Sequence, residues 1–322
     1  MLPLIGSLTR LSADSAAGMG RVLELERRVL SGDFPQGGRG VAQLYAKVKR
    51  SAYYYPACAW VVFLSAIGGG DFALMEEVLR DVAEYPKRSK VPEAALAAEL
   101  TRIAMMQVLR APYPEPNWLS AFDLAVIPSA WRGQAALLAL NRMIWHGETE
   151  RAAVLAEAML ALVADVAPAG SYPDVALKLA CARIAHDGMR MDAARKWATE
   201  AARSAKLSGV IFPFLGKALG PKSPIEMALA EEAPDLLAKV KAINAGCFRN
   251  LLRLHNRHTG DSVVETLSPR EFYLGCALKR GMRYKEIAER MGVSPANAHN
   301  LVIALYSTLH IRKASELTTQ VW

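Results

Sequence analysis

The stretch LSPREFYLGCALKRG, residues 267–281, and the stretch YKEIAERMGVSPANAHNLVIALYSTL, residues 284–309, together decide the fold of the C-terminal region. Ser268, Pro269 and Glu271 have the spacing of a capping box, in which serine and glutamate side chains bind each other's backbone N–H groups. We therefore predict a helix from Pro269 to about Arg280, closed by Gly281.

The second stretch predicts two further helices around a short turn. The segment YKEIAERM forms a short helix that ends at Gly292, and Ser294 with Pro295 begins the next helix with the same cap chemistry. Two helices separated by about three residues around a glycine form a helix-turn-helix, the motif that places its second helix in the major groove of DNA.

The order of these motifs resembles the LuxR/GerE-type DNA-binding domain. The matching positions run without gaps from Leu267 to Leu317 and comprise LSPRE, Gly281, KEIAERMGVS, Leu309, Ile311 and SEL at 315–317. The resemblance implies a four-helix domain with its third helix in the major groove. It also implies double-stranded DNA as a partner and a homodimer through the C-terminal helix.

The predicted recognition helix departs from the family's pattern, because residues 293–309 contain no lysine and no arginine. Family members usually have threonine, valine and lysine after the serine that begins this helix, and further basic residues near its end. Here Asn297 and His299 lie among the first of these positions, and Ser307 and Thr308 lie at the last. The usual cationic contacts are absent from the helix.

Two interpretations follow, and the first is that DNA binding persists with the positive charge moved to the rim. Phosphate contacts supply most of the affinity, and we expect them from Arg283, Lys285, Ser294, Arg312 and Lys313, with added charge from Arg249, Arg253 and Arg257. Base edges accept other partners than lysine: asparagine pairs with adenine, histidine donates to guanine, and an apolar side chain touches a thymine methyl. The expected base-facing residues are Asn297, His299, Asn300 and Ile303.

The second interpretation is that this domain has lost its DNA affinity. Leu301, Ile303 and Leu305 would then make the helix a surface for a protein partner or for dimerisation, and the chain would be an interaction or scaffold protein. Ordinary core packing also explains apolar residues at helical spacing, and Ile303 alone is expected on the side away from the core.

The net charge of +8 is concentrated near the C-terminus. Residues 1–238 carry 26 basic and 25 acidic side chains, residues 239–266 carry 5 and 2, and residues 267–322 carry 8 and 4. Clustered positive charge favours a polyanion, and nucleic acid is the polyanion that the helix-turn-helix suits.

The first 240 residues predict an all-α body of helical hairpins. HGETERAAVLAEAM from His146 and DGMRMDAARKWATEA from Asp187 align at a fixed offset, and VIFPF from Val210 is a weak exception with strand character. We expect Gly147 and Gly188 to take the left-handed conformation that ends each first helix. Stacked hairpins form a solenoid, and residues 60–210 resemble tetratricopeptide-like repeats.

Enzyme chemistry is not indicated, and we predict no catalytic residue, cofactor or metal. GVIFPFLGKAL, from Gly209, has neither the spacing of a phosphate loop nor the serine or threonine after Lys217 that such a loop needs. We expect His146 and His186 to be helix-end histidines. The YYY run at residues 53–55 and Trp60 could line a ligand groove or, as favoured, pack in the core.

Four cysteines with no metal or redox spacing are expected to be buried thiols: Cys58, Cys181, Cys247 and Cys276. The longest apolar run is too short to cross a membrane, and MLPLIGSLTR has no signal-peptide pattern. We therefore expect a cytoplasmic protein without a membrane partner.

The domain organisation that follows has three parts. Residues 1–240 form an all-α helical-repeat domain that binds a protein or small-molecule effector, residues 241–261 form a basic helical linker, and residues 262–322 form the DNA-binding domain. Ser223, Pro224 and Glu226 repeat the capping-box spacing, so we expect a helical connection. These features together predict a LuxR-type transcription regulator.

Overall fold

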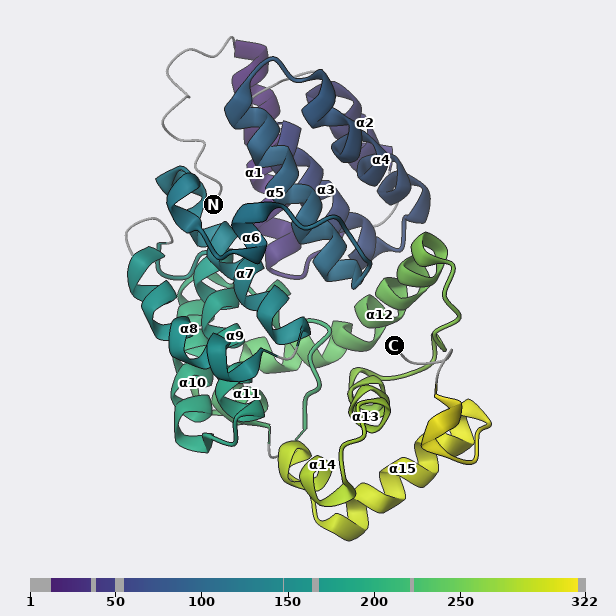
Figure 1. Cartoon of the computed structure of the whole chain (residues 1–322). Helices are drawn as coiled ribbons and strands as arrows, with labels where there is room; N and C mark the ends of the chain where they lie inside the picture. The colour runs from purple at the N-terminus through teal and green to yellow at the C-terminus, as the bar shows by residue number, and fades with distance from the viewer. Residues whose placement is uncertain are drawn as a thin grey trace.

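The computed structural model describes residues 13–35, 39–49, 55–146, 148–163, 168–220 and 223–317. These residues form helices and connecting loops, with no strand among them. The predicted all-α class is therefore confirmed for this part of the chain. In Figure 1 the N-terminal helices lie at one end of the molecule and the last two helices lie at the opposite end.

The body is built from consecutive helices that pack against each other. The first pair is α1 (Ala13–Leu30) with α2 (Arg39–Val48), followed by α3 (Tyr55–Gly69), α4 (Phe72–Arg88) and α5 (Pro92–Leu109). Beyond the short α6 (Asn117–Ser120), α7 (Arg132–Trp145) packs on α8 (Thr149–Val163), and α9 (Tyr172–Asp187) packs on α10 (Met191–Ser208). Helix α3 is buried on all sides, as its continuous apolar sequence requires.

The alanines of the α9–α10 hairpin explain how closely its two helices pack. Ala194, Ala198 and Ala201 in α10 are almost completely buried. Their small side chains let the backbones of α9 and α10 approach each other closely. The expectation of alanine-rich hairpins fits this pair, while a tetratricopeptide-like solenoid stays a prediction.

The turn between α9 and α10 differs from the expected glycine turn. Gly188 has φ −86°, whereas Met189 has φ +58° and takes the left-handed conformation instead. Met189 donates its backbone N–H to the oxygen of His186 at 3.0 Å. This hydrogen bond closes the turn with a non-glycine residue in the left-handed conformation. The expectation for Gly188 was wrong, and Gly147 lies outside the described residues.

The segment with strand character is a short helical turn. Residues Phe212–Phe214 form a 3-10 helix, and Ile211 donates its backbone N–H to Leu30 of α1 at 2.7 Å. This segment packs against the body as an irregular buried connection, because both Ile211 and Phe214 are fully covered.

Two helices connect the body to the C-terminal region: α11 (Pro224–Glu232) and the long α12 (Pro234–Thr259). Ser223 makes no side-chain cap hydrogen bond, so the predicted capping box at this position is wrong. The carboxylate of Glu226 instead accepts a hydrogen bond of 2.6 Å from Lys241 of α12. The connection is nevertheless helical on both sides of residue 233.

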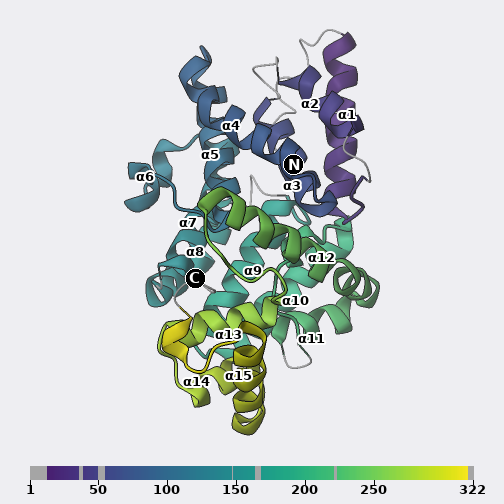
Figure 2. The same ribbon diagram turned by 90° about the vertical axis from the view of Figure 1, so that its right-hand side faces the viewer.

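Helix α12 belongs to both parts of the molecule. Its first half packs Leu237 and Val240 against the body, and its second half packs Phe248 and Leu252 into the core of the C-terminal region. The residues proposed as a linker, 241–261, thus lie mostly within one continuous helix. Figure 2 shows α12 crossing the molecule between the body and α13.

The C-terminal region contains α13 (Pro269–Lys279), α14 (Tyr284–Met291), α15 (Pro295–Leu309) and a 3-10 turn at Ala314–Glu316. Its core is formed by apolar residues that include Phe272, Ile287, Val302, Leu305 and Leu309. The proposed dimerisation helix would follow this turn, where residues 318–322 lie outside the described residues.

The described helices include none that is long and apolar enough to cross a membrane. Cys58, Cys181 and Cys247 are buried as expected, whereas Cys276 in α13 is only partly buried. The expectation of four buried thiols was therefore wrong for Cys276, which lies beside a cavity instead of in the core.

Candidate nucleic-acid interface

Local capping interactions set the ends of the three C-terminal helices. The Ser268 hydroxyl accepts the backbone N–H of Glu271 at 3.2 Å, and the Glu271 carboxylate accepts the backbone N–H of Ser268 at 2.8 Å. The predicted capping box is thus confirmed, with the helix beginning at Pro269. Satisfied N–H groups at this end stabilise the start of α13 by about 1 kcal/mol.

The turn between α14 and α15 also has the predicted chemistry. Gly292 follows α14 in the left-handed conformation, with φ +62°, and the Ser294 hydroxyl accepts the backbone N–H of Asn297 at 3.2 Å. Glycine is suited to this turn because it has no Cβ to clash. These short-range contacts orient α15 relative to α14.

Helix α15 divides into a buried and an exposed face. Ala298, Val302 and Leu305 point into the core and are almost completely buried. All four residues expected to face bases are exposed: Asn297, His299, Asn300 and Ile303. The Ile303 side chain retains 54% of its accessible surface, so it lies away from the core as predicted.

His299 is held against an aromatic side chain that the sequence patterns did not single out. Its ring lies 5.8 Å from the ring of Tyr284, in an edge-to-face arrangement of the kind aromatic rings favour. Tyr284 begins α14 and is itself 43% exposed. The sequence feature that could have identified Tyr284 is its position directly before Lys285, outside the apolar pattern of α14.

A second aromatic side chain packs behind this pair. Burial, the nearby Tyr284 ring and a hydrogen bond with Tyr284 raise the pKa of Tyr306. Tyr284 therefore contacts both Tyr306 and His299. The imidazole of His299 is presented from a defined position on the exposed face of α15.

The residues expected to contact phosphates lie at the start of α14, at the N-cap of α15 and just after α15, and are all exposed: Arg283, Lys285, Ser294, Arg312 and Lys313. The backbone N–H groups of Arg283 and Arg312 bind Glu286 at 2.9 Å and Glu316 at 3.0 Å, which fixes the main chain and leaves both guanidinium groups at the surface. Ser294 uses its oxygen as a cap acceptor, so its O–H proton remains able to donate to a phosphate.

The three arginines of α12 differ in how they are used. Arg253 binds Glu265 at 2.7 Å, and Arg257 binds Glu76 of α4 at 2.5 Å. Two of the expected rim charges are thus neutralised within the chain, and only Arg249 forms no ion pair with a described residue. The added charge of α12 is smaller than its sequence indicates.

The described part of the chain contains no cluster of three or more side chains suited to hold a metal ion. Comparisons with protein-family models, curated proteins and solved structures give no match to this chain. The assignment of a function therefore depends on the residues and their geometry.

Proposed function

We propose that the chain is a DNA-binding transcription regulator of the LuxR type, with an all-α body that responds to a ligand or a protein partner. One observation carries the proposal: α15 exposes four side chains able to contact base edges, and five side chains suited to phosphates are exposed at its N-cap, in the preceding helix and just after its end. The resemblance of residues 267–317 to the LuxR-type domain supports the same function.

The charge distribution supports a role of this kind for the C-terminal region. Helix α15 carries no lysine or arginine, while Arg283, Lys285, Arg312 and Lys313 lie before and after it. Phosphates lie on both sides of the major groove, so cations that flank a helix in that groove reach them without occupying the base-facing positions. Affinity would come from the rim and sequence preference from α15.

Binding of the full-length protein to labelled genomic duplex fragments at about 50 and 200 mM salt tests this proposal. Roughly five phosphate contacts weaken the affinity several hundred-fold between these concentrations. Binding with such a steep salt dependence supports the regulator. Absence of binding at both concentrations would contradict it.

The other candidate function is that of an interaction protein whose last domain binds a partner or dimerises. The exposed Ile303 on a helix without cations favours this alternative. Ile303→Lys separates the two functions, because an added cation strengthens DNA binding and disrupts an apolar interface. A variant that loses self-association, measured by sedimentation, without gaining DNA affinity would favour the interaction protein.

A further inference from the structure

A cavity of about 480 Å³ lies between the body and the C-terminal region. Its walls come from α5, α7 and α9 of the body, from residues 212–220, and from α12, α13 and the end of α14. Small-molecule sites in proteins have volumes of about 300–1,000 Å³ and often lie between domains. The size and the position of this cavity fit such a site.

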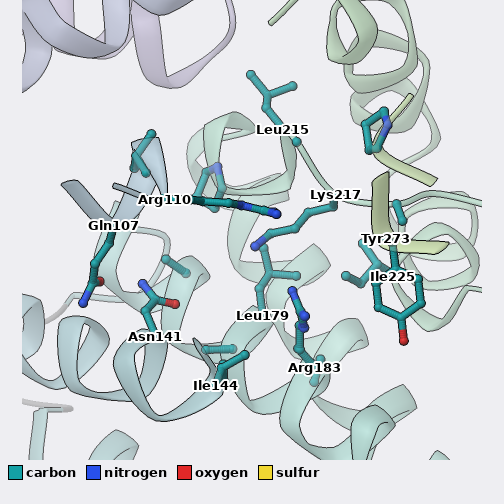
Figure 3. A pocket seen from close by; sticks show the side chains of 18 of the residues that line it. Gln107, Arg110, Asn141, Ile144, Leu179, Arg183, Leu215, Lys217, Ile225 and Tyr273 are labelled. Atoms are coloured by element: carbon teal, nitrogen blue, oxygen red, sulfur yellow. The ribbon is translucent and has the colours of Figure 1, made fainter. Parts of the chain in front are cut away.

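Three cationic side chains point toward one another inside the cavity. Figure 3 shows the end groups of Arg110, Arg183 and Lys217 converging from the end of α5, from α9 and from the segment after residue 214. Burial, together with the charges of Arg183 and Arg110, lowers the pKa of Lys217 to about 8. Burial also lowers the pKa of Arg110 to about 10.

The backbone conformation at Arg110 directs this side chain into the cavity. Arg110 follows α5 with φ +55°, in the left-handed region, which costs a non-glycine residue about 1 kcal/mol. Glycine is the usual residue at such a helix end. Strain of this kind persists where the side chain has a function.

The backbone of Lys217 is fixed by Asn244 of α12. The Asn244 amide oxygen accepts the N–H of Gly216 at 2.6 Å, and its amide nitrogen donates to the oxygen of Lys217 at 3.1 Å. Gly216 has φ +71°. Because the main chain is held on both sides, the Lys217 side chain is positioned in the cavity by α12 and not by its own loop alone.

The positive charge is only partly balanced by carboxylates. Asp187 of α9 lies 3.3 Å from Arg183 and 4.0 Å from Arg290 of α14. Among the described residues, no carboxylate lies within 4.0 Å of the Lys217 ammonium. Lys217 is partly buried, and a charge removed from water is stabilised by an anionic partner, so an anion bound beside the Lys217 ammonium would stabilise it.

Further along the cavity, two polar atoms lack a donor. The side-chain oxygens of Gln107 and Gln134 are buried and accept no hydrogen bond from the described residues. The Gln107 amide nitrogen already donates to Tyr113 and to the oxygen of Leu138, both at 2.9 Å, which leaves its oxygen as the free group. In Figure 3 Gln107 and Asn141 lie to one side of the three cations.

The remaining surface of the cavity is largely apolar. Trp60, Ile144, Leu179 and Leu215 line it, and the same side chains pack against the body core. An occupant therefore needs an apolar body between an anionic group at the cations and a group with an N–H or O–H donor at Gln107 and Gln134. A buried acceptor that receives no hydrogen bond is destabilising, so a ligand that donates to Gln107 or Gln134 gains affinity.

We infer that this cavity is an effector site for a small organic anion with an apolar body and a hydrogen-bond donor, held at its anionic group by Arg110, Arg183 and Lys217. The inference deepens the proposed function, because it names the class of ligand that the regulator's body senses. The ligand site itself does not depend on DNA binding.

The position of the site gives a bound anion a way to act on the helix-turn-helix. Arg110 lies over the ring of Phe272 in α13, and Tyr273 and Cys276 of that helix and Arg280 just after it also line the cavity. Arg110 and Lys217 belong to the body, and α13 forms the facing wall of the same cavity. An anion bound there lies between the two parts of the molecule, so it favours the arrangement in which α13 is docked on the body. A ligand shifts a conformational equilibrium by its difference in affinity for the two arrangements.

A matched pair of probes tests the ligand class directly on the full-length protein. 8-Anilinonaphthalene-1-sulfonate has an anionic group, aromatic rings and an N–H donor, and N-phenyl-1-naphthylamine has the same rings and donor without the charge. Calorimetric titration is expected to give one sulfonate bound per chain, at least tenfold more tightly than the neutral amine. Equal affinities for the two probes would overturn the inference.

Variants at Lys217 locate the binding to this cavity. Lys217→Met is expected to weaken sulfonate binding roughly tenfold or more, since a charged hydrogen bond contributes on the order of a tenfold factor. Lys217→Arg keeps the charge and is expected to retain most of the affinity. Lys90→Met, at an exposed loop position between α4 and α5, is the matched control. Unchanged binding in a folded Lys217→Met variant would contradict the site.

Proton uptake on ligand binding is a second measurement. It is expected if the Lys217 ammonium contacts the anion, and it is not expected if Lys217 has only a structural role. An anion beside the ammonium raises its pKa, so binding near pH 8 takes up on the order of half a proton. Titrations in buffers of different ionisation enthalpy measure this uptake. The other titratable or charged groups that line the cavity are Glu26, Arg110, Arg183, His186 and Asp187 of the body and Tyr273, Cys276, Arg280 and Arg290 of the C-terminal region. Uptake that persists in Lys217→Met would contradict the assignment.

Failure of this inference and failure of the proposed function give different results. Sulfonate binding without DNA binding would support the cavity and remove the regulator. DNA binding without sulfonate binding would support the regulator and contradict the ligand site in the cavity. Inorganic phosphate at similar concentration is expected to bind much more weakly than the sulfonate, because it lacks an apolar body; equally tight binding would overturn the organic part of the ligand class.

Discussion

The guanidinium of Arg110, at the end of α5, lies 4.5 Å from the ring centroid of Phe272 in α13. This cation–π contact joins the body to the C-terminal region at the edge of the cavity. Because Phe272 is also part of the C-terminal core, a change at Arg110 reaches the core against which α14 and α15 pack.

The partly buried Lys217 ammonium is expected to lower the stability of the ligand-free protein. Its folded pKa, about 8, lies below the ordinary lysine value of 10.5, so the unfolded chain binds the proton more tightly. Lys217→Met is therefore expected to be more stable below pH 8, by on the order of 2 kcal/mol. Chemical denaturation from pH 7 to 10.5 is the measurement.

The pH dependence of that difference has a definite sign. As the pH rises through about 8, the folded protein releases the Lys217 proton first, so the wild type gains stability relative to Lys217→Met. The two proteins approach each other in stability at high pH. A difference that is constant over this range would contradict burial of a charged Lys217.

His255 is expected to hold the end of α12 against the body. Its Nδ1 lies 2.8 Å from the oxygen of Leu109, and its Nε2 lies 2.8 Å from the Asp261 carboxylate. The side chain is 2% exposed. His255→Leu removes both polar contacts and is expected to cost about 1–3 kcal/mol in the free energy of unfolding.

The exposed His258, three residues further along α12, provides the control for His255. His258→Ala is expected to change the free energy of unfolding by less than about 0.5 kcal/mol. Urea denaturation followed by circular dichroism measures both variants. A His255→Leu protein as stable as the control would show that its two hydrogen bonds do not hold α12.

Rim cations are expected to contribute to DNA affinity without sequence preference. Lys285→Ala or Arg312→Ala should weaken binding to all duplexes alike and lower the salt slope by about one. Lys90→Ala, at an exposed position in the body, should leave both quantities unchanged. Affinity titrations at several salt concentrations measure the slope. A loss confined to one duplex sequence would assign these side chains to base contacts instead.

Residues on the exposed face of α15 are expected to affect sequence preference instead. His299→Ala and Asn300→Ala should each relax the preference between matched and mismatched duplexes by about 1–3 kcal/mol. Tyr284→Phe keeps the ring beside His299 and is expected to preserve the preference. Competition binding with duplex variants measures these changes. Unchanged preference in both alanine variants would remove these residues from base reading.

The C-terminal helices could be predicted because their ends depend on residues within four positions. The Ser268 and Ser294 caps and the left-handed Gly292 follow from local hydrogen bonding, and the structure has all three. The same local reasoning failed at Ser223 and Gly188. There, the Lys241–Glu226 ion pair and the hydrogen bonds around Met189 provide the stabilisation that the pattern assigned to other residues.

The cavity could not be predicted in this way. Arg110, Arg183 and Lys217 belong to separate elements and to no motif, and Lys217 appeared only in a rejected phosphate loop. The sequence by itself determined the helical class, the helix-turn-helix caps and the exposed face of α15, because short-range backbone geometry and helical periodicity specify them. Only the tertiary structure decided that three cations meet between the body and α13, because convergence and burial depend on the packing of helices distant in the chain.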